Sequence, residues 1–319
     1  MQAIVFDGEL RLQEMPRPNN PDEALIRVSR VGICNTDIEI VHGYAGYKGI
    51  LGHEFVGVVE SAPNDDMVGE RVVGEINAGC GVCDLCEQGD SRHCPNRTVL
   101  GIVNRSGAMA EYVSLPVRNL LTVPDSISDE EAVFTEPLAA ACEVLEQVKI
   151  SVNHNVAVIG DGKLGLLIAQ VLSTTGCQLT HVGKHANKLE ITAGRGIHTL
   201  TVGDDINGRL AGSFDIVVEA SGAAGGFKLA QEIVRPRGAI VMKSTIHGDV
   251  PFDAARIIVN EITLIGSRCG RFESALSLLE QKKVDVKPLV SMTFPLSNGV
   301  DAMSYAQQPG VMKVQLLNS

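Results

Sequence analysis

The sequence predicts a two-domain α/β protein, in which a barrel-like β domain precedes a doubly wound parallel sheet. Residues 1 to about 145 hold short β-rich runs that Gly, Pro and Asn separate, as in antiparallel barrels. From about residue 153, apolar runs alternate with amphipathic segments, as in parallel sheets covered by helices on both faces. The length of 319 residues is sufficient for two domains.

The first predicted domain spans 1–145. Its strand candidates are AIVFDG, EALIRVSRVG, FVGVVESAP, ERVVGEI and AEYVSLP. Near its end, SDEEAVFTEPLAAACEVLEQV has a helical pattern, with Ser128 as the expected N-cap and Glu131 three residues later. We therefore expect antiparallel β-structure followed by one helix.

The second predicted domain spans 146–268. Its strand candidates are NVAVIG, QLTHVG, FDIVVEAS, GAIVMKS and ITLIGS, and its helix candidates are KLGLLIAQVLSTTG, ANKLEITAGRG and GGFKLAQEIVR. The remaining residues, 269–319, include the helix candidate FESALSLLEQKK and are too few to bury a core of their own. We expect this segment to return to the first domain.

The composition limits the possible partners. Apolar residues make up 45% of the chain and charged residues 20%, as in globular proteins. The net charge of −11 argues against nucleic acid or an anionic membrane as a partner. No apolar run reaches the roughly 18 residues of a membrane span. The first residues alternate like a strand and lack the features of a leader, so we expect a cytoplasmic location.

A glycine-rich turn opens the second domain. Gly160, Gly162 and Gly165 have the spacing G-x-G-x-x-G, with Lys163 and Leu164 inside the motif. Glycine is common here, 33 of 319 residues, so the spacing alone is weak evidence. However, an apolar strand precedes the motif and an amphipathic helix follows it, as in dinucleotide-binding turns whose free N–H groups face a pyrophosphate. The alternative is a strand–helix turn that binds no nucleotide.

Four cysteines within 79–95 have the spacing C-x2-C-x2-C-x7-C. They are Cys80, Cys83, Cys86 and Cys94. Four thiolates without an open position are typical of a structural zinc site, which stabilises its lobe and performs no chemistry. A redox pair or an iron–sulfur cluster is the alternative, but the chain shows no second cluster-like set of cysteines.

Cys34 and His53 are candidates for a second, catalytic zinc site. Each lies beside Gly at a strand or turn boundary, and each has acidic neighbours that could orient a ligand. A catalytic zinc needs about three protein ligands and one open position. We expect the third ligand to be Glu136, or Glu54 as a ligand that exchanges in and out. Taken singly, Cys34 would usually be a buried core thiol and His53 a structural histidine.

Together these segments resemble the zinc-dependent medium-chain dehydrogenase/reductase family, which includes alcohol, sorbitol and threonine dehydrogenases. The matching motifs are GICNTD, GHEFVGVV, the four-cysteine lobe, TEPLAAA, VAVIGDGKLGLLIAQ and FDIVVEASG. The resemblance implies a GroES-like catalytic domain interrupted by a Rossmann domain, and an assembly of two or four identical chains. It also implies hydride transfer between a small alcohol or carbonyl compound and a nicotinamide cofactor.

The resemblance assigns roles around the metal. It implies catalytic zinc on Cys34, His53 and Glu136, with Glu54 as the conditional ligand. The EPLA motif resembles the polyol and threonine branch of the family, in which the third ligand is not a cysteine.

Further roles follow from the same resemblance. Thr36 aligns with the residue that hydrogen-bonds the bound alcohol, Asp37 with a carboxylate behind the ligands, and Lys313 with a basic family position. The chain departs from the pattern at Glu39, where many members carry a proton-relaying histidine, and this leaves the route of the proton open.

Two other functions fit parts of the pattern. A non-enzymatic NAD(P)-binding sensor or structural protein would keep the glycine turn and the cysteine lobe but lose the catalytic ligands. A zinc-independent quinone or enoyl reductase of the same superfamily would lack both cysteine sets. Because the candidate ligands of both sites are present, the zinc enzyme is the favoured hypothesis.

The residues after the second strand bear on the choice of cofactor. NAD-binding folds place an acid here, about twenty residues after the turn, to bind the ribose 2′-hydroxyl. This chain has Gly183, followed by the basic residues Lys184, His185 and Lys188. Glycine removes the carboxylate, and the cations can pair with a 2′-phosphate. The sequence thus predicts NADP rather than NAD. A solvated helix start is the alternative explanation of Lys184.

Overall fold

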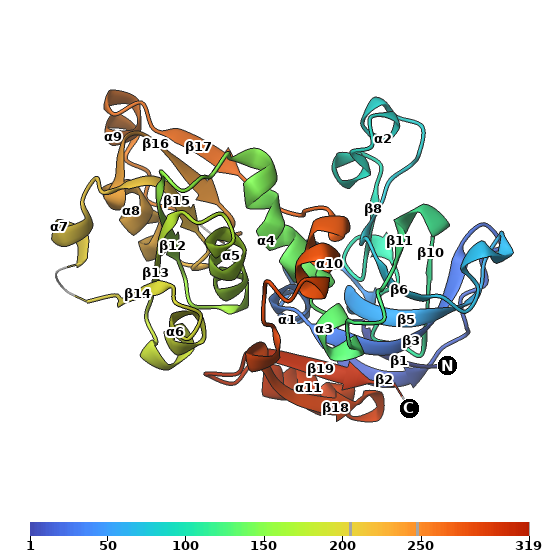
Figure 1. The fold of residues 1–319 in the computed structure, drawn as a ribbon. Helices are drawn as coiled ribbons and strands as arrows, with labels where there is room; N and C mark the ends of the chain where they lie inside the picture. Colours follow the sequence, from blue (N-terminus) through green and yellow to red (C-terminus); the bar gives the residue numbers. More distant parts are fainter. Residues whose placement is uncertain (204–205, 247–248, 319) are drawn as a thin grey trace. The chain divides into compact units, whose positions relative to one another are not determined.

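A computed structural model describes residues 1–203, 206–246 and 249–318, without the side chains of Asp65, Ile206 and Asn207. Figure 1 shows the helices and strands in sequence colours.

The chain forms two compact units. The first contains Met1–Glu136, Ala275–Glu280 and the segment from Val286 onward; the second contains Pro137–Ser274 and Gln281–Asp285. Helix α4 (Thr135–Gln147) therefore lies almost entirely in the second unit. The domain boundaries at 145/146 and 268/269 stay predictions.

A curved seven-stranded sheet forms the centre of the first unit. Its order is β11-β6-β5-β3-β19-β18, and β10 also pairs with β3. The strands are β3 (Ala24–Ile33), β5 (Glu54–Ser61), β6 (Arg71–Gly74), β10 (Tyr112–Leu115), β11 (Leu120–Thr122), β18 (Val290–Pro295) and β19 (Lys313–Leu317). Two register shifts between β3 and β5 bend the sheet toward a barrel. Because β19 pairs antiparallel with β3, the C-terminal segment completes this sheet.

Smaller elements surround the central sheet. Two three-stranded sheets have the orders β2-β1-β4 and β7-β8-β9. Their strands are β1 (Gln2–Phe6), β2 (Leu10–Glu14), β4 (Gly49–Ile50), β7 (Asn77–Ala78), β8 (Thr98–Leu100) and β9 (Asn104–Arg105). The helices are α1 (Asn35–Val41), α2 (Asp84–Glu87), α3 (Asp129–Ala132), α10 (Phe272–Glu280) and α11 (Gly299–Ala306). Short 3-10 helices are η1 (Tyr44–Gly46), η2 (Asp65–Met67), η3 (Ser91–His93), η4 (Val117–Asn119), η5 (Lys287–Leu289) and η6 (Leu296–Asn298).

The segment predicted as one helix after Ser128 forms two. The expected capping box is present, since Ser128 and Glu131 each accept a hydrogen bond from the other's backbone N–H. Helix α3 nevertheless ends at Ala132, and α4 begins anew at Thr135. Pro137 lies in the first turn of α4, where backbone N–H groups have no intrahelical partner and a proline costs little.

A six-stranded parallel sheet forms the centre of the second unit, in the order β14-β13-β12-β15-β16-β17. The strands are β12 (Asn155–Ile159), β13 (Gln178–Gly183), β14 (His198–Thr201), β15 (Phe214–Glu219), β16 (Val234–Met242) and β17 (Thr263–Gly266). In chain order this is 3-2-1-4-5-6, the arrangement of doubly wound nucleotide-binding sheets. The predicted sheet is confirmed. Only β14 had no predicted counterpart, because HTLT is short and mostly polar.

Helices on the second unit connect the parallel strands. They are α5 (Lys163–Ser173), α6 (Ala186–Ala193), α7 (Ile206–Leu210), α8 (Ala224–Ile233) and α9 (Ala254–Val259), whereas α4 precedes the first of these strands. One buried cluster joins Val217 and Ile240 of the sheet to Phe227 and Ile233 of α8. Burial of the strands on both faces explains why their sequences are nearly continuous apolar runs.

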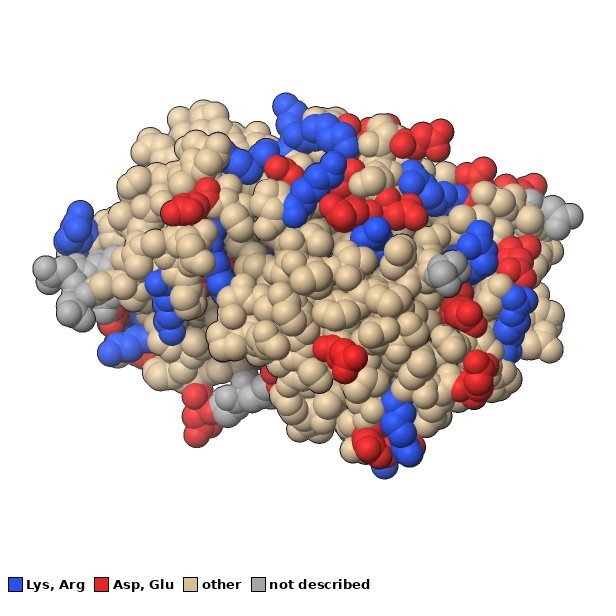
Figure 2. Space-filling view, turned by 90° about the horizontal axis from the view of Figure 1, so that it is seen from below, with Lys and Arg blue, Asp and Glu red and all other residues tan. Residues whose placement is uncertain are grey.

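The described residues contain no helix that is both long and apolar enough to cross a membrane. On the face drawn in Figure 2, Lys and Arg side chains alternate with Asp and Glu side chains. The net charge of the whole chain is −11, so an anionic ligand would need locally placed cations.

Candidate metal and cofactor sites

The carboxylate of Asp37 holds the start of helix α1. Cys34 directly follows β3 and is the N-cap of α1, and Asp37 occupies the third helical position. Oδ2 of Asp37 accepts a hydrogen bond of 2.8 Å from the backbone N–H of Cys34. The Asp37 side chain is fully buried. An acid in the first turn also interacts favourably with the helix dipole.

The same carboxylate reaches the segment that carries His53. Oδ1 of Asp37 accepts a hydrogen bond of 3.1 Å from the backbone N–H of Gly52 and lies 3.5 Å from Nδ1 of His53. Burial lowers the pKa of His53, but the negative charges of Asp37 and Cys34 outweigh it and raise this pKa well above its ordinary value. Asp37 thus connects two ligand candidates that lie far apart in the sequence.

Cys34, His53 and Glu54 come together at this point. One ligand atom from each lies within 4.8 Å of the other two. His53 is 3% exposed and Glu54 1% exposed, and within the described part of the chain Nδ1 of His53 and Oε1 of Glu54 have no hydrogen-bond partner. Leaving a buried polar atom unpaired costs about 1–3 kcal/mol. A thiolate, an imidazole and a carboxylate are ligands that zinc prefers, so these residues fit a zinc ion.

Lys313 neutralises part of the charge of this group. Its side chain is 1% exposed, and Nζ forms an ion pair with Oε2 of Glu54. Burial lowers the pKa of Lys313, but Glu54 and Cys34 outweigh it and raise this pKa. Gly32 leaves the room for this pair, because a Cβ there would lie 2.5 Å from Oε2 of Glu54.

Glu136 and Thr36 lie near the group of three without belonging to it. Burial raises the pKa of Glu136 to about 7, with Glu54 acting in the same direction and His53 opposing. Glu136 is therefore an electrostatic neighbour of the candidate ligands, although Glu54 is the carboxylate gathered with them. Oγ1 of Thr36 lies 3.6 Å from Sγ of Cys34, so its hydroxyl borders the same space.

The four cysteines of the lobe also converge. The sulfurs of Cys80, Cys83, Cys86 and Cys94 all lie within 4.8 Å of one another, and none forms a disulfide. The backbone N–H of Cys80 donates to Sγ of Cys94 at 3.3 Å and lowers the pKa of that thiol to about 6. Four thiols held at one point, one of them stabilised as a thiolate by a backbone N–H group, fit a structural zinc ion.

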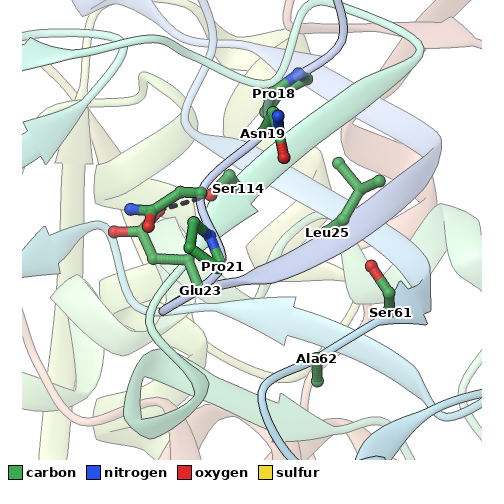
Figure 3. Close-up of a pocket in the computed structure, with 9 residues that line it drawn as sticks. Pro18, Asn19, Pro21, Glu23, Leu25, Ser61, Ala62 and Ser114 are labelled. Atoms are coloured by element: carbon green, nitrogen blue, oxygen red, sulfur yellow. Dashed lines mark hydrogen bonds between the residues drawn. The ribbon is translucent and has the colours of Figure 1, made fainter.

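A hollow of about 190 Å³ in the first unit lies apart from both clusters. It is lined by residues such as Pro18, Pro21 and Leu25 (Figure 3). Its acidic residue is already paired, since Glu23 accepts hydrogen bonds from the Ser114 hydroxyl and from Arg105. None of the predicted metal ligands lines this hollow, so we assign it no role.

The glycine-rich turn of the second unit has the geometry expected of a phosphate cradle. Gly160 has φ +121°, which favours glycine, and a Cβ at Gly165 would overlap the carbonyl oxygen of Gly160. Around Gly162, the N-cap of α5, a Cβ would meet no atom within 4 Å. Lys163 and Leu164 start the helix and are half-buried. Open space in front of a helix N-terminus fits a dinucleotide pyrophosphate.

The end of β13 contains a carboxylate that the sequence analysis did not assign. Oδ2 of Asp161, from the glycine-rich turn, accepts hydrogen bonds from the backbone N–H groups of Lys184 (2.7 Å) and His185 (2.6 Å). The premise that no acid lies here is therefore wrong. The side chains of Lys184 and His185 are exposed and that of Lys188 is half-buried. The missed signal is an acid inside the turn combined with a glycine at the strand end.

We expect Cys86→Ser to remove the zinc of the lobe and to lower the melting temperature by at least about 5 °C. The physical reason is that a structural metal contributes its binding energy to folding. Elemental analysis and thermal denaturation measure the two effects. Cys177→Ser, at a thiol outside both clusters, is the control. Unchanged zinc content and melting temperature in Cys86→Ser would contradict the assignment.

Asp37→Asn should weaken zinc binding at the group of three by about 10- to 100-fold, because the carboxylate that orients His53 is lost. Competition with a chelator measures this affinity. Glu39→Gln is a matched control on the same helix; Glu39 contacts the side chain of Asn35 at 3.4 Å and is not in the group. Equal zinc retention by Asp37→Asn and the wild type would rule out the orienting role.

Two glycine substitutions separate binding from folding. Gly162→Ala should leave stability unchanged and weaken dinucleotide binding at least about tenfold, because its Cβ points into open space. Gly165→Ala should destabilise the fold by about 1–3 kcal/mol, because its Cβ overlaps Gly160. Calorimetric titration and urea denaturation test the pair. Dinucleotide affinity that is unaffected by Gly162→Ala would refute the cradle.

Comparison with known proteins agrees with these sites. A family model described as alcohol dehydrogenase GroES-like domain matches residues 20–125, and one described as zinc-binding dehydrogenase matches residues 164–281. The sorbitol dehydrogenase of Halalkalibacterium halodurans is 30% identical over 332 residues, which cover 97% of this chain and 96% of that protein. The predicted GroES-like and Rossmann folds are thereby confirmed.

Two solved structures are similar over nearly their whole length. A zinc-binding dehydrogenase from Sinorhizobium meliloti bound to NADP has 26% identity and a TM-score of 0.91, with coverage of 99% of this chain and 98% of that one. An alcohol dehydrogenase from Escherichia coli complexed with NADH has 25% identity and a TM-score of 0.91, with 99% of each chain covered. From these matches, the chain belongs to the zinc-dependent medium-chain alcohol dehydrogenase family.

Proposed function

We propose that this protein transfers a hydride between a secondary alcohol of the polyol type, or its carbonyl form, and a nicotinamide cofactor. The observation that carries the proposal is the convergence of Cys34, His53 and Glu54 within 4.8 Å, where Oε1 of Glu54 is buried without a hydrogen-bond partner among the described residues. The polyol class is supported by the similarity to a sorbitol dehydrogenase. A screen of alcohols and carbonyls with both nicotinamide cofactors tests it.

In the proposed mechanism, Cys34, His53 and a carboxylate would hold the catalytic zinc. Sequence similarity favours Glu136 as the third ligand, and the geometry favours Glu54. When bound, zinc would act as a Lewis acid on the substrate oxygen and the nicotinamide would take up the hydride. Asp37 keeps the imidazole of His53 in one orientation from behind. Lys313 balances the charge of Glu54, which limits the electrostatic cost of gathering acids in a buried place.

Thr36 is the proposed carrier of the substrate proton. Its hydroxyl lies 3.6 Å from Sγ of Cys34 and can accept a proton at Oγ1 while it donates its own onward. Glu39 follows three residues later on the same helix and therefore projects from a similar face. A carboxylate at this position offers a next acceptor where many relatives of the family carry histidine.

The preference between NAD and NADP remains a prediction. The basic side chains of Lys184, His185 and Lys188 favour NADP, because they can pair with a 2′-phosphate. The carboxylate of Asp161 opposes a 2′-phosphate in the same place. Solved relatives with NADP and with NADH are both known, so similarity favours neither cofactor.

The assembly and location also stay predictions. We propose a homodimer or homotetramer in the cytoplasm, with one catalytic and one structural zinc ion per chain. The alternative function, a non-enzymatic NAD(P)-binding sensor or structural protein, is not favoured. It would require a disrupted metal site, whereas three candidate ligands lie together.

Cys34→Ala should lower kcat/KM for any accepted alcohol by at least about a thousandfold, because the catalytic metal loses a ligand. Zinc content should fall by about one ion per chain, while the melting temperature and dinucleotide affinity stay close to those of the wild type. Steady-state kinetics and elemental analysis provide the measurements. Cys177→Ala is the control, and near-normal turnover by Cys34→Ala would exclude the mechanism.

A further inference from the structure

Asp161 follows strand β12, but its side chain forms hydrogen bonds at the end of the neighbouring strand β13. It lies between Gly160 and Gly162, after β12, and its carboxylate crosses to the end of the neighbouring parallel strand β13. There Oδ2 accepts the backbone N–H groups of Lys184 and His185 and lies 3.0 Å from Nδ1 of His185. Three contacts fix this carboxylate at the place where nucleotide-binding folds have their ribose-binding acid.

Gly183 and Asp161 are spatially complementary. A Cβ at Gly183 would lie 2.6 Å from Cβ and 2.8 Å from Oδ2 of Asp161. Real Cβ atoms do not approach that closely, so a side chain at Gly183 and the observed carboxylate of Asp161 exclude each other. The glycine is therefore explained by the room that Asp161 occupies, without reference to a phosphate.

The carboxylate of Asp161 is negatively charged, and one of its oxygens is free to accept a further hydrogen bond. Burial raises the pKa of Asp161, but the hydrogen bonds from His185 and Lys184 outweigh it, so this pKa lies below its ordinary value. The side chain is 11% exposed. All three contacts use Oδ2, and the described residues provide no hydrogen bond to Oδ1. This oxygen can accept a hydroxyl proton and would repel a phosphate.

We propose that Asp161 replaces the ribose-binding acid of the second strand, accepts a hydrogen bond from the adenosine ribose, and makes the protein selective for NAD over NADP. The inference rests on the proposed function, because it assumes that this turn binds a nicotinamide dinucleotide.

The nearby cations do not outweigh this carboxylate. The His185 ring is already paired with Asp161. Lys184 has an exposed side chain, and attraction between exposed charges is weak and screened by salt. The carboxylate is mostly buried beside the turn, where screening is weaker, and it is held by backbone groups. Lys184 and Lys188 can still attract the pyrophosphate, which both cofactors share.

Binding of NAD⁺ and NADP⁺ to the zinc-loaded protein, measured by titration calorimetry, tests the proposal without turnover. The wild type should bind NAD⁺ more tightly. Asp161→Asn should reduce this preference about 10- to 100-fold, because it removes a charge-assisted hydrogen bond and a repulsion. Asparagine retains one oxygen for the two backbone N–H groups, so the turn keeps its shape. An unchanged NAD⁺/NADP⁺ ratio in a folded Asp161→Asn would overturn the proposal.

Asp215→Asn is the matched control. Asp215 is also a carboxylate that accepts a backbone N–H, from Asn155 at 2.7 Å, but it lies at the amino end of the parallel sheet. Its replacement should leave the ratio of the two affinities as in the wild type. An equal change in both variants would mean that general destabilisation, and not the position of Asp161, alters the ratio, which contradicts the proposal.

A reciprocal exchange tests the spatial argument. Gly183→Asp alone should lower the melting temperature, because the new side chain overlaps Asp161. In Asp161→Gly/Gly183→Asp the overlap is gone, and both the melting temperature and the preference for NAD⁺ should recover. If Gly183→Asp alone were as stable as the wild type, the two positions would not exclude each other.

If Asp161→Asn does not fold, the binding of adenosine fragments to the wild type tests the proposal instead. The wild type should bind 5′-AMP at least as tightly as adenosine 2′,5′-bisphosphate. Tenfold tighter binding of the bisphosphate would overturn the selectivity. If neither dinucleotide binds, the proposed function fails and the inference fails with it. If both bind without the expected selectivity, only the inference fails.

Discussion

The buried carboxylate of Asp37 is the interaction on which the candidate metal centre depends. It accepts the backbone N–H of Cys34 with one oxygen and that of Gly52 with the other, and it faces the ring of His53. A buried charge is stable only if such partners compensate for its lost hydration. The carboxylate therefore requires both segments to be in place, and in return it fixes the positions of a thiol and an imidazole.

Charge balance explains why acids can gather around those ligands. Glu54 has one oxygen paired with Lys313 and the other without a partner among the described residues. Lys313 comes from β19, which pairs with β3, so the C-terminal segment supplies the cation. Without it, Glu54 and Glu136 would repel each other in a poorly hydrated place. A divalent cation at the unpaired oxygen would complete the compensation.

Much of the fold and part of the candidate sites could be predicted from the sequence. Cysteine spacing identified the lobe, and alternating strands and helices identified the parallel sheet. Segments with weak local signals were missed: β14 is short and mostly polar, and the break between α3 and α4 falls inside an unbroken helical pattern. The role of Asp161 was also missed. Its carboxylate lies against Gly183 at the end of β13, and no local sequence pattern shows that an acid after β12 reaches that place.

The sequence by itself determined the order of the two folds, the four-cysteine lobe, the glycine turn and the family. The first three follow from spacing and periodicity, which are local, and the family follows from the resemblance of several motifs taken together. Only the tertiary structure decided that Glu54, rather than Glu136, is gathered with Cys34 and His53, and that a carboxylate lies at the end of β13. The reason is physical: side chains distant in sequence meet only once strands pair in register, and burial then determines which charges must be compensated.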